Sequence, residues 1–168
     1  MRRVSDRPEA AGSLPGPTWL GARPVKLTTQ IKLEIPSDAQ LLRVVRGVVE
    51  QWCLRAGFAE DDCRQVTLAV DEAMANVIRH AYGGQPGQPI EIICSANDRG
   101  VEFVIEDRGK PVDRVRLAAA TEKRPDELRP GGRGAYFIEQ IMDQVEYETL
   151  PGRNRARLVK YRPAKKDV

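Results

Sequence analysis

Aromatic side chains, cysteines and long apolar runs are all scarce in this sequence. Aromatic residues make up 5% of the 168 positions, and no apolar run approaches the roughly 20 residues of a membrane-spanning helix, so no membrane protein is expected. Cys53, Cys63 and Cys94 are widely spaced and odd in number, which fits neither a zinc site nor a disulfide framework. We expect buried or incidental thiols in a reducing cytoplasm. The basic start at Met1 has no apolar segment behind it, so no secretion signal is expected.

A large excess of charge of one sign is also lacking. The 27 Lys and Arg residues are nearly balanced by 24 Asp and Glu residues, for a net charge of +3. Proteins that bind nucleic acid usually concentrate basic residues on one face, so we expect no direct contact with nucleic acid. The length indicates one domain with room for a real core.

Proline and glycine are concentrated near the start of the chain. Seven of these residues fall between Pro8 and Pro24, and such spacing prevents regular structure. We therefore expect a flexible arm over residues 1–25, one folded domain over 26–162 and a polar tail over 163–168.

Hydrophobic periodicity predicts the elements of this domain. Alternation over 27–35 predicts a half-buried strand, and Ser37 is the expected cap of a helix that runs to Gly57. The other expected elements are a helix over 60–81, strands over 89–96 and 101–107, a polar loop over 108–132, a helix over 134–143, and strands over 144–150 and 155–161. This order predicts an α/β two-layer sandwich, with helices on one face of a mixed, mostly antiparallel sheet.

Three polar residues repeat at intervals of four on the expected second helix. Glu72, Asn76 and His80 therefore share one helix face, close to the border of its apolar stripe. A carboxamide oxygen can bind Mg²⁺, and a carboxylate one turn away can hold a water molecule or accept a proton. The alternative is an ordinary amphipathic helix with polar residues at its border. His80 is more simply explained as a structural hydrogen-bonding group.

Two further stretches combine glycine with a polar or charged residue. Asp107 ends a strand and Gly109 follows it, so the acid can accept a hydrogen bond from an exocyclic amine such as that of adenine. The glycines at 131, 132 and 134 precede a helix, where free backbone N–H groups can hold phosphate oxygens and Arg133 can add charge. Each stretch alone is equally compatible with a plain turn.

Together and in this order, the three stretches resemble the GHKL ATPases. Residues 71–82 resemble the N-box, residues 106–113 the first glycine box, and residues 131–143 the second glycine box with its helix. The ending of the first box and the strand at 157–160 resemble the anti-sigma-factor subgroup, the RsbW/SpoIIAB-like serine/threonine kinases. The resemblance covers about residues 27–161.

The resemblance implies a Bergerat fold and Mg-ATP as the cofactor. It also implies phosphorylation of a STAS-domain anti-anti-sigma protein and sequestration of a sigma factor. By resemblance, Glu72 is the catalytic base and Asn76 the Mg²⁺ ligand, while Asp107 recognises the adenine amine above Gly109. The residues that would line the phosphates, under a lid over 112–131, are Gly131, Gly132, Arg133 and Gly134.

Two departures from the family pattern keep a second function open. Tyr136 follows the glycine box closely, and Asn154 stands where the family often has a threonine that helps the adenine contact. Both are compatible with a non-catalytic ATP-binding module that acts by contact alone. A third possibility, the ATPase half of a histidine kinase, is disfavoured because His80 lies inside the nucleotide motif and no dimerisation helix pair is present.

The expected first helix carries the candidate partner contacts. Arg43 lies where similar kinases offer an arginine to a sigma factor or its antagonist, and Arg46 is one turn further along. A solvated basic face is the alternative. By resemblance, the strand over 27–35 and the first helix are candidate surfaces for a homodimer.

Overall fold

A computed structural model describes residues 29–112 and 134–163 of the chain. The expected arm over 1–25, most of the expected lid and the end of the tail lie outside these ranges. The elements in chain order are β1 (Thr29–Pro36), a 3-10 turn η2 (Ala39–Leu41), α1 (Leu42–Arg55), α2 (Glu60–Asn76), a π-helical turn η3 (Val77–Ala81), β2 (Pro89–Asn97), β3 (Gly100–Asp107), α4 (Gly134–Ile141), β4 (Gln144–Leu150) and β5 (Arg153–Tyr161).

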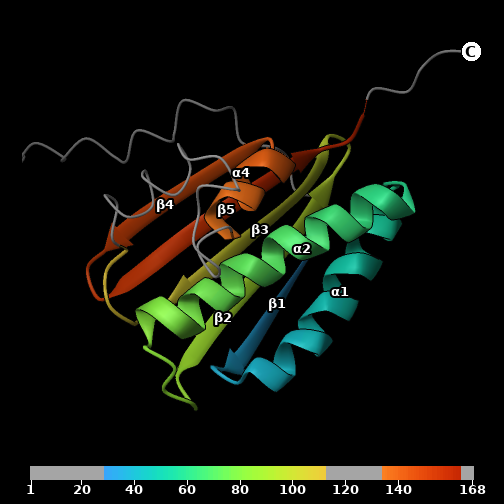
Figure 1. The fold of residues 1–168 in the computed structure, drawn as a ribbon. Helices are drawn as coiled ribbons and strands as arrows, with labels where there is room; N and C mark the ends of the chain where they lie inside the picture. Colours follow the sequence, from blue (N-terminus) through green and yellow to red (C-terminus); the bar gives the residue numbers. More distant parts are fainter. Residues whose placement is uncertain (1–28, 113–133, 164–168) are drawn as a thin grey trace, which may run out of the picture.

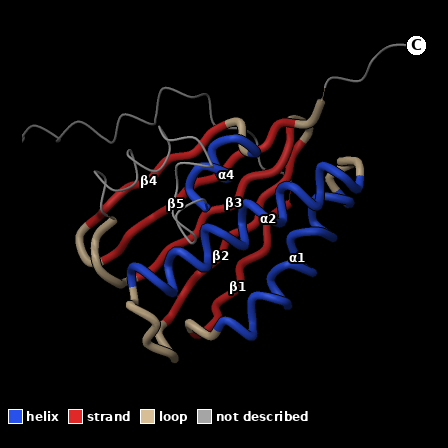
Figure 2. Tube along the Cα trace, viewed as in Figure 1, coloured by secondary structure: helices blue, strands red, loops and turns tan. Residues whose placement is uncertain are grey.

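The strands form one five-stranded sheet in the order β1-β2-β3-β5-β4. All four neighbouring pairs are antiparallel. Helices α1, α2 and α4 lie on the same face of the sheet (Figures 1 and 2). The predicted α/β two-layer sandwich with a mostly antiparallel sheet is therefore confirmed.

The middle strand β3 shows how the sheet divides its side chains. Val101, Phe103 and Ile105 point toward the helices and are at most 2% exposed. They pack with the buried face of α2, which includes Val66 and Val70. Alternation of this kind buries one face of a strand and leaves the other free. Among 29–112 and 134–163, no helix combines the length and apolarity needed to cross a membrane.

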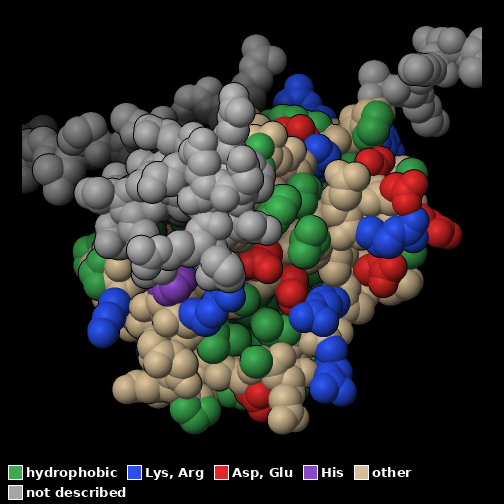
Figure 3. All heavy atoms as spheres, viewed as in Figure 1, with side chains coloured by type: hydrophobic (Ala, Val, Ile, Leu, Met, Phe, Trp, Pro, Cys, Tyr) green, Lys and Arg blue, Asp and Glu red, His purple; other side chains and the backbone are tan. Residues whose placement is uncertain are grey.

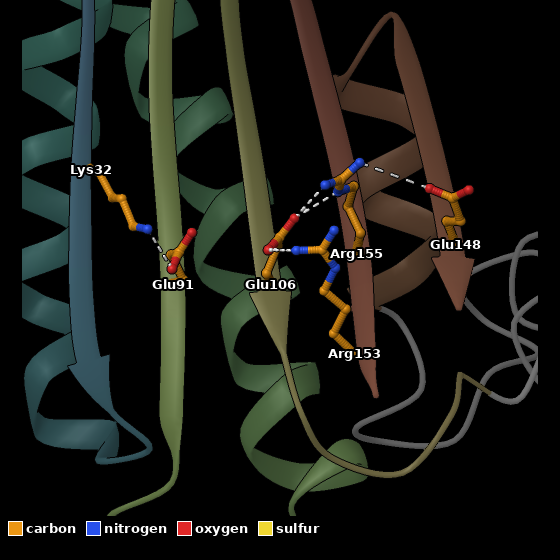
Figure 4. Close-up of polar contacts among 6 residues, drawn as sticks. All are labelled: Lys32, Glu91, Glu106, Glu148, Arg153 and Arg155. Carbon is orange, nitrogen blue, oxygen red and sulfur yellow. Dashed lines mark hydrogen bonds and ion pairs between the residues drawn. The ribbon is translucent and has the colours of Figure 1, made fainter. Parts of the chain in front are cut away.

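The opposite face of the sheet carries ion pairs that run across the strands (Figure 4). Lys32 of β1 lies 2.7 Å from Glu91 of β2, and Glu106 of β3 lies 2.6 Å from Arg155 and 3.3 Å from Arg153 of β5. Because the basic partners are partly exposed, each pair contributes only about 0–1 kcal/mol. They keep this face polar without fixing the fold.

Helix α1 ends in a glycine-dependent motif. Gly57 has φ of 84°, a value that a residue with a Cβ adopts only with strain. Its N–H donates to the carbonyl of Leu54, and the N–H of Phe58 donates to the carbonyl of Cys53. This is the Schellman pattern, in which the last carbonyls of the helix receive their hydrogen bonds beyond its end.

The expected cap of the first helix, Ser37, is wrong. Asp38 caps the 3-10 turn η2 that leads into α1, because its Oδ1 accepts the N–H of Gln40 at 2.8 Å, and α1 itself begins without a side-chain cap. The Ser37 hydroxyl instead donates to the carbonyl of Gln85 and accepts the N–H of Gln88. Ser37 is thus recruited by the loop before β2, a long-range contact that competes with local capping.

The expected helix over 60–81 is also corrected, because its last turn is not α-helical. Helix α2 ends at Asn76, and Val77–Ala81 form a π-helical turn. The Tyr82 N–H donates to the carbonyl of Val77, five residues earlier, at 3.0 Å. Such turns insert one residue into a helix and often occur at functional sites.

Replacing Phe103 with alanine tests the packing of β3 against the helices. Phe103→Ala should lower the free energy of unfolding by about 3–5 kcal/mol, because it leaves a cavity under α2. Val104→Ala, on the open face of the same strand, should cost only about 1 kcal/mol. Urea denaturation measures both, and equal losses would contradict the assignment of faces.

Candidate functional site

Two oxygen-bearing side chains on α2 share one cationic partner. Glu72 and Asn76 lie one turn apart and are both half-buried. Arg79 Nη2 lies 3.3 Å from Glu72 Oε2 and 3.2 Å from Asn76 Oδ1. Both oxygens therefore reach one cation position, and a metal ion held by both of them would have to displace the guanidinium. The predicted shared helix face for Glu72 and Asn76 is confirmed.

Helix α4 begins directly against Glu72. A Cβ placed on Gly134 would meet the end of the Glu72 side chain, so a larger residue there would require the Glu72 carboxylate to move. The first described residue of the expected second glycine box, Gly134, thus meets the expected N-box. Positions 131–133, with Gly131, Gly132 and Arg133, lie outside the described residues.

The loop after β3 packs on the π-helical turn η3. A Cβ on Gly109 would lie 2.6 Å from both the carbonyl carbon and the oxygen of Ala81. The N–H of the next residue, Lys110, donates to the same Ala81 oxygen at 2.9 Å. The last carbonyls of a helix have no hydrogen-bond donor within the helix, and here the loop supplies a donor for the carbonyl of Ala81.

Tyr82 links the end of this helical segment to two strands. Its hydroxyl accepts the N–H of Arg108 at 2.9 Å and donates to the carbonyl of Pro89 at 2.6 Å. Burial raises the pKa of the Tyr82 phenol, which keeps it a neutral donor. The sequence analysis did not single out Tyr82, although an aromatic residue with a polar tip beside a motif was a usable signal.

Asp107 is a buried acid at the end of β3. It is 5% exposed, and its Oδ1 accepts the N–H of Gly109 at 2.8 Å and Nδ2 of Asn154 at 2.9 Å. Burial raises the pKa of the Asp107 carboxyl, and the two hydrogen bonds act against that shift. Asn154 lies opposite Asp107 in the pairing of β3 with β5. Its side chain therefore belongs to the site.

His80 lies on the exposed surface of η3, away from the core. The surface on the helical side of the molecule carries Lys and Arg side chains interspersed with Asp and Glu side chains (Figure 3). The pairing of Glu72 and Asn76 with Arg79 does not include His80. A structural hydrogen-bonding role for His80 stays a prediction.

The two arginines predicted to contact partners differ in their surroundings. Arg46 donates two hydrogen bonds to the carboxylate of Asp71 on α2, at 2.8 and 3.0 Å. It therefore joins α1 to α2 and is engaged within the chain. Arg43 is exposed, and among the described residues its side chain donates only to the backbone carbonyl of Gln40, at 3.1 Å.

Replacing Gly109 with alanine tests the contact between the loop and η3. The added Cβ meets backbone atoms of Ala81, which cannot move as cheaply as a side chain, so the Lys110 N–H should lose its acceptor. Hydrogen exchange of the Lys110 amide should accelerate about tenfold or more. The control is Gly47→Ala on α1, where no atom lies within 4 Å of the added Cβ and stability should rise by about 0.5–1 kcal/mol. Unchanged exchange at Lys110 would contradict the close approach.

Comparison with known proteins identifies the family. Residues 35–160 match the model of the histidine kinase-like ATPase domain. The serine-protein kinase RsbW of Oceanobacillus iheyensis is 29% identical over 127 residues, which cover 73% of this chain and 80% of that protein. The serine-protein kinase RsbW of Halalkalibacterium halodurans is 32% identical over 129 residues, covering 73% and 77%.

A solved structure shares the fold. The crystal structure of the RsbU and RsbW domains of a Mycobacterium tuberculosis protein has a TM-score of 0.57 to this chain, at 19% identity. The match covers 82% of this chain and 34% of the mycobacterial one, so it spans about a third of that longer protein. The resemblance inferred from the sequence is confirmed: the chain belongs to the histidine kinase-like (GHKL) ATPase family and to its RsbW-like group.

Proposed function

We propose that the chain is an ATP-dependent serine/threonine protein kinase and anti-sigma factor of the cytoplasm. In this proposal, residues 26–162 form the kinase domain, which phosphorylates a STAS-domain anti-anti-sigma protein and sequesters a sigma factor. The observation that carries it is the meeting of Glu72, one turn from Asn76, with the first residue of α4 at Gly134. The relatives' name, serine-protein kinase, supports the same activity.

The donor set on α2 fits Mg²⁺. Magnesium prefers oxygen ligands and is usually shared between one or two protein groups and substrate phosphates. Asn76 Oδ1 and Glu72 Oε2 already converge on one cation, the guanidinium of Arg79. Asn76 would hold the ion, which would neutralise charge on the triphosphate when bound.

Glu72 is placed to serve as the general base. Its side chain is 29% exposed, so a serine or threonine hydroxyl of a docked partner can reach it. The hydroxyl proton passes to the Glu72 carboxylate while the hydroxyl oxygen bonds to the γ-phosphorus and ADP leaves.

Asp107 and the glycine boxes would hold the rest of the nucleotide. A buried carboxylate can accept a hydrogen bond from the exocyclic amine of adenine, and Gly109 leaves room for the ring above the loop. Gly134 opens α4, and the helix N-terminus attracts phosphate oxygens. The preceding Gly131, Gly132 and Arg133 are proposed to add further donors.

The partner surfaces follow from the difference between the two arginines. Arg43 is exposed on α1 and available to an acidic surface of a sigma factor or antagonist. Arg46 is engaged with Asp71, so we propose that it orients α1 and contributes to binding only if that pair opens. β1 at the sheet edge and α1 remain the proposed surfaces of a homodimer.

A non-catalytic ATP-binding module is the second candidate function. Tyr136, in the first turn of α4, packs edge-on against Phe137 with ring centroids 5.9 Å apart. An aromatic ring this close to the phosphate end can restrict the approach of an acceptor protein. High affinity for Mg-ATP with no transfer to a STAS-domain partner would favour this candidate.

Removing the carboxylate of Glu72 tests the catalytic assignment. Glu72→Ala should keep Mg-dependent ATP binding, measured by calorimetry, because Asn76 and Asp107 remain. Transfer of radiolabelled phosphate to a STAS-domain partner should fall roughly 10²–10⁴-fold, because the base is lost.

The matched control is Glu60→Ala, an exposed acid in the first turn of the same helix. It should leave both binding and transfer unchanged. Normal transfer by Glu72→Ala would remove Glu72 from the chemistry, and absence of ATP binding by the unmodified chain in excess Mg²⁺ would overturn the proposed function.

Reversing the charge of Arg43 tests the partner surface. Arg43→Glu should weaken capture of the sigma factor or STAS protein about tenfold or more, because a buried interface charge is left facing its like. Arg55→Glu, at the exposed end of the same helix, is the control and should have little effect. A pull-down with purified partner measures both, and equal binding by Arg43→Glu would remove Arg43 from the interface.

A further inference from the structure

The side chain of Asn154 makes several contacts at the site, although the proposed function gives this residue no role. It is 3% exposed, although asparagine usually lies at the surface. Its Nδ2 lies 2.9 Å from Asp107 Oδ1, 2.9 Å from the carbonyl oxygen of Lys110 and 3.4 Å from that of Gly109. Its Oδ1 lies 3.3 Å from the hydroxyl of Thr149 on β4.

The surroundings fix which end of the amide is the nitrogen. Three acceptors surround one side-chain atom, and a hydroxyl donor faces the other. An amide nitrogen has two hydrogens and its oxygen only accepts, so the opposite orientation would place four oxygens in repulsive contact. The orientation of Asn154 is therefore determined by its neighbours.

The two carboxylate oxygens of Asp107 differ in the hydrogen bonds that they accept. Oδ1 accepts from Asn154 and from the N–H of Gly109. No hydrogen bond reaches Oδ2 from residues 29–112 or 134–163. A carboxylate has acceptor capacity on both oxygens, so Oδ2 keeps its own for a ligand.

We propose that Asn154 is a positioning residue for nucleobase recognition: it holds Asp107 by Oδ1 and fastens the loop at Lys110, so that Oδ2 faces the base with its acceptor free and selects adenine over guanine. The proposal rests on the proposed function of this site. Adenine presents an amine at the position where guanine presents a carbonyl oxygen, which a carboxylate repels.

A serine or threonine hydroxyl in place of Asn154 could not make both of these contacts. One hydroxyl hydrogen can satisfy either Asp107 or the carbonyl of Lys110, whereas the amide of Asn154 satisfies both. The loop that carries Gly109 is thus fastened from two sides, by Asn154 on β5 and by Ala81 on η3. The asparagine that departs from the family pattern is suited to hold both the acid and its loop.

The pH dependence of nucleotide binding can report on this role of Asn154, because few charged groups surround Asp107. The titratable groups near Asp107 are Tyr82, which follows η3, and Arg108 and Lys110 on its own loop. Strand β5 presents the neutral Asn154, and β2 presents the aliphatic Ile90. The hydrogen bond from Asn154 lowers the pKa of Asp107 against the effect of burial. Without it, the carboxyl takes up a proton at higher pH.

The experiment measures affinity for Mg-ATP and Mg-GTP by calorimetry across a series of pH values, using the full chain. The variants are Asn154→Ala and the gentler Asn154→Ser, which keeps one donor. The matched control is Asn97→Ala, because Asn97 also anchors a turn with its side chain, at the opposite end of β3. Asp107→Asn reports on the proposed function itself.

Asn154→Ala should weaken ATP binding about tenfold or more and reduce the ATP-to-GTP preference. Its binding should also begin to fall at higher pH than that of the unmodified chain, because protonated Asp107 is a poorer acceptor. Asn154→Ser should show a smaller change in the same direction. Asn97→Ala should lower thermal stability but leave preference and pH dependence unchanged.

Two failures are distinguishable. If the unmodified chain binds ATP and Asp107→Asn loses the preference, but the Asn154 variants match the unmodified chain in preference and pH dependence, Asn154 does not position the acid. If the unmodified chain binds neither nucleotide, the proposed function fails and this inference with it. If Asn154→Ala does not fold, Asn154→Ser decides by the same two readouts.

Discussion

Close contacts with one helical segment hold the candidate site together. Gly134 meets Glu72 near the middle of that segment, and Gly109 meets Ala81 at its end. A Cβ on Gly109 would meet backbone atoms of Ala81, and a Cβ on Gly134 would displace the Glu72 carboxylate, so the loop after β3 and α4 both lie close to this segment. Elements that are distant in the sequence are thereby brought to one line, along which we propose that a nucleotide lies, with its base at one end and its phosphates at the other.

The sheet supplies the second constraint. Antiparallel pairing of β3 with β5 sets Asp107 opposite Asn154, on the face that the helices cover. A shift of one residue in this register would turn Asn154 to the open face, among the ion pairs of Figure 4. The core resists such a shift, because Leu158 of β5, which is fully buried and pairs with Phe103, would turn to the open face together with Asn154. Packing of the apolar core therefore also secures the polar contact at the strand end.

Local patterns were sufficient to predict much of this arrangement. The spacing of Glu72 and Asn76 follows from helix geometry alone, and Asp107 follows from the alternation that ends with β3. The five strands and their helices were predicted for the same reason, since each has a clear period. The roles suggested for Gly131, Gly132 and Arg133 remain predictions, because these residues lie outside the described ranges.

Contacts between distant residues could not be predicted in the same way. Asn154 could be seen in the sequence only as a departure from the family pattern. Its partner Asp107 is 47 residues away, and the two residues meet only through the register of β3 and β5. The guanidinium of Arg79 over Glu72 and Asn76, and the internal engagement of Arg46, depend on side-chain directions that spacing does not specify. The prediction of Ser37 as a cap was wrong for the same reason, since its hydroxyl donates to a carbonyl of a distant loop.

The π-helical turn at Val77–Ala81 limits how this segment can change in evolution. Its extra residue rotates everything beyond it by about 100° relative to a continuous α-helix. Deleting one residue there would restore α-helical geometry and turn the Ala81 carbonyl away from Lys110. Side chains within the turn can therefore vary, whereas the number of residues between Asn76 and Tyr82 is fixed by the need to meet the loop, so homologous sequences should align here without gaps.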